Sequence, residues 1–296
     1  IKTYDEANKN TKARSASVYQ NTNTTVSGSE TSTINISDQG PHTIIIQSGG
    51  TLGSIGNTGN IIYASTNNGN TLTLANLTNN GTINGKVAIQ NSQDNLTGAI
   101  TVNTFENKGQ VNGQIYMGVW GNKNSGILTV DQFNNSGTIT AFDKNQGVFF
   151  EGGANNKSTI NNFNNTGVIS STNKEAVQFT HTDVKTITNN GNIKSEGHRG
   201  ISINNSSVQT LNNSGTIQTS NQNVNNWDTQ AIYIGSSTIQ TFINSGTLKG
   251  DGRKDPGGPN GAMFASSGVN LSGSTITNFD NSGILSGRVG INISST

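Results

Sequence analysis

A seven-residue pattern recurs along this chain and limits the folds open to it more than any other feature. It reads apolar, x, Asn, x, Gly, x, apolar, and it occurs nine times, for example as FNNSGTI at Phe133–Ile139 and FNNTGVI at Phe163–Ile169. Successive glycines of the pattern are 22, 28, 28, 30, 24, 24, 31 and 37 residues apart. A catalytic motif normally occurs once, whereas a motif that returns at this period indicates a repeat architecture.

Two further features accompany each copy of the pattern. A β-branched residue precedes the first apolar residue by three positions in seven copies, and a short apolar segment such as Ile115–Met117 or Gly200–Ile203 follows the last one. Each repeat therefore predicts three short strands joined by turns, with no helical periodicity. We predict an all-β fold, a right-handed parallel β-helix with three sides and about nine to eleven coils. Residues 1–50 are expected to form an N-terminal cap with irregular first coils, and residues 51–296 the β-helix repeat domain.

The composition fits a stacked repeat better than an ordinary globular core. Hydrophobic residues make up 29% of the chain, charged residues 11%, and the formal net charge is +1. Such a chain can fold when each unit needs few apolar residues and stacks on a copy of itself. The near-neutral charge argues against nucleic acid as a partner, because nucleic acid requires a basic surface. The chain has no cysteine, which excludes disulfides and thiolate metal sites.

The recurring pattern itself predicts a corner between two strands. The first apolar residue should point inward, so that Phe105, Phe133 and Phe163 form one stack and Phe242 and Phe279 another. The glycine should supply a positive φ or a close backbone approach. The asparagine two residues before it can bond its counterparts in neighbouring coils, as amide ladders do in stacked strands. The predicted ladder contains Asn57, Asn79, Asn107, Asn135, Asn165, Asn189, Asn213, Asn244 and Asn281.

Two long insertions between strands are the candidate binding loops, because loops on a rigid scaffold commonly carry function. They are Thr219–Thr229 and Lys249–Asn260, and adjacent coils would place them side by side. An exposed Trp beside basic residues is a plausible binding patch. The alternative is that the Trp folds back over its coil and the loop is merely tolerated; Trp120 is a similar but weaker candidate. The candidate binding residues are Trp227, Asp228, Arg253, Lys254 and Asp255.

Catalytic chemistry is not indicated by the sequence. β-Helix enzymes that act on polysaccharides need clustered carboxylates or carboxylates that bind calcium. The sixteen Asp and Glu residues are scattered over different repeat positions, and the three histidines, His42, His181 and His198, share none. We therefore expect no catalytic residues, no metal site and no cofactor.

The Asn-rich, cysteine-free units of the form F-x-N-S/T-G-x-I resemble the passenger domains of type V autotransporters. The resemblance covers about residues 51–296 and is closest to Campylobacter and Helicobacter autotransporters, including adhesin passengers and the repeat region of vacuolating-cytotoxin-like proteins. It implies a virulence-associated protein at the bacterial cell surface or secreted from it. It also implies attachment, in the full-length protein, to a C-terminal outer-membrane β-barrel that is not in this chain.

An adhesin is the function that this resemblance favours. Its partner would be a host cell-surface or matrix component, another bacterium, or a second copy through self-association. One alternative is a toxin-like passenger that oligomerises or acts on membranes. A further alternative is a polysaccharide-active β-helix enzyme, which would depend on single carboxylates.

Overall fold

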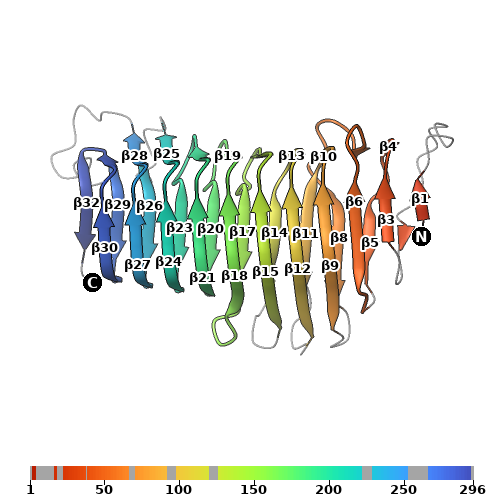
Figure 1. Ribbon diagram of the computed structural model, residues 1–296, viewed down its shortest axis with the longest axis horizontal. Helices are drawn as coiled ribbons and strands as arrows, with labels where there is room; N and C mark the ends of the chain where they lie inside the picture. Colours follow the sequence, from red (N-terminus) through yellow and green to blue (C-terminus); the bar gives the residue numbers. More distant parts are fainter. Residues whose placement is uncertain are drawn as a thin grey trace.

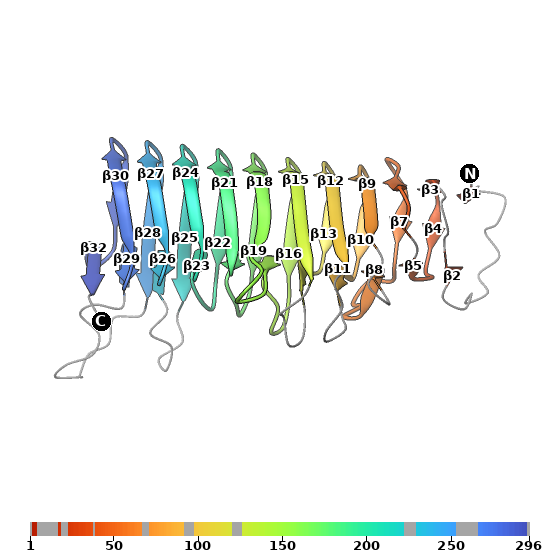
Figure 2. The same ribbon diagram turned by 90° about the horizontal axis from the view of Figure 1, so that it is seen from below.

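The chain folds into a right-handed parallel β-helix, in which successive coils stack into a rod (Figures 1 and 2). The computed structural model describes residues 2–4, 17–18, 23–37, 39–66, 71–91, 98–119, 126–221, 229–252 and 266–294. Within these residues the strands form three parallel sheets of 11, 10 and 11 strands. β1 and β32 lie toward opposite ends of the rod (Figure 1). The all-β parallel β-helix predicted from the sequence is therefore confirmed.

Each complete coil visits sheet A, then sheet C, then sheet B. Sheet A contains β1 (Lys2–Tyr4), β3 (Asn23–Val26), β6 (His42–Ile46), β9 (Leu72–Asn79), β12 (Ala99–Asn107), β15 (Ile127–Asn135), β18 (Ser158–Asn165), β21 (Thr182–Asn189), β24 (Ser207–Asn213), β27 (Thr238–Asn244) and β30 (Thr275–Asn281). Sheet C contains β4 (Ser29–Glu30), β7 (Thr51–Leu52), β10 (Thr82–Asn84), β13 (Gln110–Asn112), β16 (Thr138–Ala141), β19 (Val168–Ser171), β22 (Asn192–Ser195), β25 (Thr216–Asn221), β28 (Thr247–Gly252) and β31 (Ile284–Ser286). Sheet B contains β2 (Ser17–Val18), β5 (Ile34–Ile36), β8 (Asn60–Thr66), β11 (Lys86–Asn91), β14 (Ile115–Val119), β17 (Val148–Glu151), β20 (Val177–Thr180), β23 (Ile201–Asn204), β26 (Thr229–Gly235), β29 (Ser266–Ser272) and β32 (Val289–Ser294).

The three sheets begin ahead of residue 51. β3 pairs with β6 without interruption, and β6 pairs with β9 across one register shift between His42 and Thr43. Residues 23–46 therefore already contribute strands to the β-helix, in a region where the sequence suggested a cap and irregular first coils.

The interior of the rod is a narrow column of stacked side chains. Phe105, Phe133 and Phe163 stack nearly parallel, with ring centroids 4.6 and 5.1 Å apart. Phe150 and Phe179, on sheet B, form a second stack at 5.3 Å whose edges meet the first. Because every coil adds its aromatic ring or aliphatic side chain to the same column, few apolar residues per coil suffice to fill it. Phe242 and Phe279 meet edge to face rather than as the expected stack, with an angle of 74° between their rings.

A ladder of asparagine side chains runs along the inside of sheet A. In each step the Nδ2 of one asparagine donates to the Oδ1 of the next at 2.7 or 2.8 Å, which joins Asn79, Asn107, Asn135, Asn165, Asn189, Asn213, Asn244 and Asn281. All of these side chains except the last are buried. At the first step the Oδ1 of Asn79 accepts from the backbone N–H of Gly81. The ladder thus satisfies polar groups that would be costly to bury alone.

Asn57 does not belong to this ladder, so that part of the prediction is wrong. It lies between β7 and β8, where its Nδ2 donates to the carbonyl of Asn84. Nearby Ile55 is 95% exposed, and Gly56 has a φ of 81°. The pattern at this copy therefore forms a turn at the corner between sheets C and B. In the coil below Asn79, the ladder position is occupied by Ile46, which pairs with Asn79 in register.

From Gly81 onward, the glycines of the recurring pattern serve close approach rather than positive φ. Gly109, Gly137 and Gly167 are not among the glycines with positive φ. A Cβ added at Gly137 would lie under 3.0 Å from the carbonyl oxygen of Gly109, and the same holds for Gly167 over Gly137. These corners stack so closely that only glycine fits.

Candidate functional site

The five loop residues predicted to bind a partner lie outside the described residues. These are Trp227, Asp228, Arg253, Lys254 and Asp255; Trp120 lies outside them as well. The strands on either side of the two insertions are described. β25 pairs with β28 and β26 pairs with β29, so both insertions connect sheet C to sheet B in neighbouring coils.

The outward side of sheet B has a row of side chains that includes four aromatic residues. Side chains alternate between the two faces of a strand, so in-register pairing lines up one outward residue from each coil. That row contains Tyr63, Ala88, Tyr116, Phe149, Gln178, Ser202, Tyr233 and Asn270. An outer row of sheet A is polar by comparison, with Thr73, Thr101, Thr129, Thr159, Asp183, Ser207, Thr238 and Thr275. Four of the eight positions in this row of sheet B are therefore aromatic, whereas seven of the eight in that row of sheet A carry a hydroxyl group.

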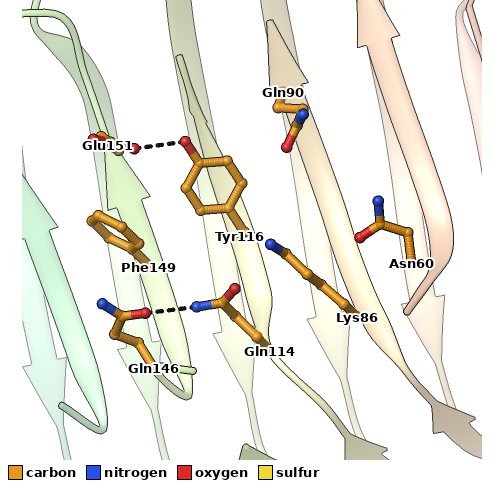
Figure 3. Close-up of a pocket in the computed structure, with 8 residues that line it drawn as sticks. All are labelled: Asn60, Lys86, Gln90, Gln114, Tyr116, Gln146, Phe149 and Glu151. Carbon is orange, nitrogen blue, oxygen red and sulfur yellow. Dashed lines mark hydrogen bonds between the residues drawn. The ribbon is translucent and has the colours of Figure 1, made fainter. Parts of the chain in front are cut away.

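A hollow of about 500 Å³ opens on this face across β8, β11, β14 and β17 (Figure 3). This volume is within the range of about 300–1,000 Å³ that is usual for ligand pockets. Its lining combines two aromatic rings, one cation, one carboxylate and four carboxamides. In that order the residues are Tyr116 and Phe149; Lys86; Glu151; and Asn60, Gln90, Gln114 and Gln146. We refer to this feature as the sheet B hollow.

Tyr116 is held rigidly beside the hollow. Its hydroxyl donates to Glu151 Oε2 at 2.7 Å, and the Lys86 Nζ lies 5.0 Å from the centre of its ring. The Phe149 ring meets it edge on at 5.4 Å. A Cβ added at Gly118 would lie 2.7 Å from the Tyr116 hydroxyl oxygen, so the ring lies over this glycine. Only 3% of Tyr116 is exposed, and its side chain is thus a fixed part of the wall.

The protonation of the lining follows from its burial. Burial raises the pKa of the Tyr116 phenol, and the charge of Glu151 and the hydrogen bond to it raise this pKa further. The phenol therefore remains a hydrogen-bond donor at neutral pH. Burial lowers the pKa of Lys86, because removal of water disfavours the charged ammonium group.

A row of glutamine amides fixes the edge of the hollow at the start of the strands. Gln114 Nε2 donates to Gln146 Oε1 at 2.8 Å, and Gln146 Nε2 donates to Gln178 Oε1 at 2.7 Å. A carboxamide has two N–H donors and two acceptor lone pairs. Gln146 therefore accepts one bond and donates another within the row, which holds its side chain in place and leaves it one N–H and one lone pair for a ligand.

The arrangement around Tyr116 recurs further along the same row. The Arg199 guanidinium lies 3.8 Å from the centre of the Tyr233 ring, and a Cβ added at Gly235 would lie under 3.0 Å from that ring. Both tyrosines occur as Ile-Tyr-x-Gly, at Ile115–Gly118 and Ile232–Gly235. In both cases the cation comes from the coil before. This recurrence was the sequence signal for an aromatic outer row, and our sequence analysis missed it.

Glu175 is a buried carboxylate at the corner that leads into β20. His198 Nδ1 lies 3.1 Å and Arg199 Nη1 4.0 Å from its Oε1. Burial raises the pKa of Glu175, but the hydrogen bond and charge of His198, a backbone hydrogen bond and the charge of Arg199 outweigh it. The pKa of Glu175 is therefore held below its ordinary value.

This lowered pKa predicts a pH-dependent effect of E175Q. An acid with a lowered folded-state pKa contributes stability above its unfolded-state pKa of about 4.3. That contribution is lost as the pH falls through the folded-state value. We expect E175Q to lower the free energy of unfolding at pH 7 by about 1–3 kcal/mol, and the difference from the wild type to shrink below pH 4.3.

Urea denaturation across this pH range measures the difference. The matched control is E196Q, because Glu196 is an exposed carboxylate that pairs with Lys194, and such pairs contribute about 0–1 kcal/mol. A difference for E175Q that stayed constant down to about pH 3 would contradict the assignment.

The lining of the sheet B hollow supplies a single carboxylate. Glycoside hydrolysis generally uses a pair of carboxylates flanking the bond, and among the eight lining residues only Glu151 is one. No three His, Cys, Asp or Glu side chains in the described ranges lie close enough to hold a metal ion. A second hollow of about 490 Å³, beside Lys157 and Asp183, has no aromatic residue in its lining.

No family model matches this chain, and neither a curated protein nor a solved structure matches it. Within the part of the chain that the structure describes, no helix has the length and hydropathy needed to cross a membrane.

Proposed function

We propose that this chain is the rod-like binding region of a bacterial surface or secreted protein of the autotransporter passenger type, and that it acts as an adhesin. The β-helix serves as a stiff scaffold, and the sheet B hollow is its binding face. The partner is a component of a host cell surface or matrix.

One observation carries this proposal. The inside of the rod repeats from coil to coil, as in the asparagine ladder, whereas the outer row of sheet B does not. Tyr116 and Phe149 stand there in neighbouring coils, and Gln178 and Ser202 in the next two. Stacking of coils does not require aromatic side chains on the outside, and clustered aromatic residues around a hollow are typical of binding sites.

Binding of the purified chain to cultured epithelial cells tests the proposed function. We expect labelled chain to bind in a saturable manner and unlabelled chain to compete for the same sites. Binding that rises linearly with concentration and is not competed would contradict the proposal, because a defined receptor has a finite number of sites.

A further inference from the structure

We propose that the ligand of the sheet B hollow is a neutral saccharide, an oligomer of hexose or N-acetylhexosamine units. This inference rests on the proposed function, because it names the ligand class of the same site.

The lining matches the two kinds of surface on a pyranose ring. One face of such a ring presents C–H groups, which pack on an aromatic side chain, and its rim presents hydroxyl groups in pairs. Phe149 supplies a half-buried ring within the hollow, while Gln90, Gln114 and Glu151 supply donors and acceptors on either side of it. A hydroxyl pair requires neighbouring donors and acceptors of this kind.

The charges of the hollow favour a neutral ligand over an acidic one. Lys86 is the cation of the lining and Glu151 the carboxylate, so their formal charges offset each other. Lys86 is also placed over the Tyr116 ring, where a cation–π contact holds it. A uronic or sialic acid would bring a second carboxylate toward Glu151, and a like charge at close range is unfavourable.

The direction and rigidity of the lining fit an extended oligomer. The hollow spans four neighbouring strands, which corresponds to about 14 Å at about 4.8 Å per strand. The glutamine row runs along the same direction, from Gln114 through Gln146 to Gln178. Since these side chains and Tyr116 are already fixed by hydrogen bonds, binding would cost little additional ordering.

Binding to a glycan array tests the inference. The test set is neutral oligosaccharides of hexose and N-acetylhexosamine, and the comparison set is sialylated and uronic-acid oligosaccharides. The test variant is F149Q, since Gln178 already occupies the same row position one coil further along. The matched control is Y233Q, which changes an aromatic residue of the same row outside the hollow. Circular dichroism checks that both variants retain the β-helix.

We expect the wild-type chain to bind at least one neutral oligosaccharide. F149Q should bind it about tenfold more weakly, a loss of about 1.4 kcal/mol in binding free energy. Y233Q should bind it as tightly as the wild type. Three results would overturn the inference: no neutral oligosaccharide is bound, only acidic ones are bound, or F149Q binds as well as the wild type.

Competition in the cell assay separates this inference from the proposed function. The competitor is an excess of free neutral hexose and N-acetylhexosamine oligosaccharides, which would occupy the same hollow. Saturable cell binding that is not reduced by these oligosaccharides but is lost in F149Q would keep the adhesin proposal and overturn the saccharide. Binding to neutral glycans on the array without saturable binding to cells would support the saccharide ligand and contradict the adhesin proposal.

Discussion

Replacing Gly167 by alanine is expected to destabilise the β-helix by more than about 3 kcal/mol, the upper end of ordinary overpacking costs. A Cβ at this position would lie under 3.0 Å from the backbone carbonyl oxygen of Gly137, which is already bonded to the Val168 N–H. A flexible side chain could move away from this contact, but a backbone carbonyl held between two coils cannot. We expect the G167A chain to lose its β-sheet circular dichroism at lower urea than the wild type.

Gly28 provides the matched control for this substitution. Its φ is not positive, and among the described residues no atom lies within 4 Å of a Cβ added there. We expect G28A to leave stability unchanged or to raise it by about 0.4–1 kcal/mol, because alanine restricts the unfolded chain. Equal effects of G167A and G28A would contradict the close-approach explanation.

Removal of one asparagine from the middle of the ladder is expected to have the second largest effect. The Oδ1 of Asn165 accepts from Asn135, and its Nδ2 donates to Asn189 and to the carbonyl of Gly167. N165A leaves the Asn189 Oδ1 buried without this donor. We expect a loss of about 2–4 kcal/mol, from one or two buried polar groups left unsatisfied.

The N165D variant sharpens this prediction. A carboxylate at this position places an oxygen where the Nδ2 of Asn165 now donates, against the Asn189 Oδ1. We expect N165D to be less stable than N165A at pH 7 and to recover stability as the pH falls, because burial raises the pKa of the carboxyl group. Urea denaturation at pH 7 and pH 4 measures both effects. N281A is the control, since Asn281 ends the ladder on an exposed strand; a loss as large as that of N165A would contradict the ladder's role.

The architecture could be predicted because each side chain in a β-helix contacts its own counterparts. Once Phe133 and Phe163 are recognised as equivalent positions, their stacking follows without knowledge of the rest of the chain. The same reasoning gave the ladder from Asn79 to Asn281. It failed at Asn57, because seven residues do not specify the corner at which they lie. There the positive φ of Gly53 and Gly56 turns the chain between sheets C and B.

The sheet B hollow could not be predicted in the same way. Lys86, Tyr116 and Glu151 are brought together only by the pairing of β11 with β14 and of β14 with β17. The lengths of the segments between those strands differ from coil to coil. The residues that share the outward row of sheet B therefore cannot be assigned until the register of the strands is known. The sequence therefore pointed to the long insertions as binding loops and not to the outward residues of sheet B.

We propose that the sheet B hollow, and not an insertion between sheets C and B, is the binding face. The decisive measurement compares the wild-type chain, F149Q and a deletion of residues 222–228 in the epithelial-cell assay. The deletion leaves a connection of the same length as in the preceding coil. Thr219 pairs with Ser195 and Ile232 pairs with Ile201. After the deletion five residues (220, 221, 229, 230 and 231) join Thr219 to Ile232, and five residues (196–200) join Ser195 to Ile201. We predict that F149Q weakens saturable binding about tenfold and that the deletion leaves it unchanged. Full binding by F149Q together with loss of binding by the deletion would contradict the claim and return the site to the insertion that holds Trp227.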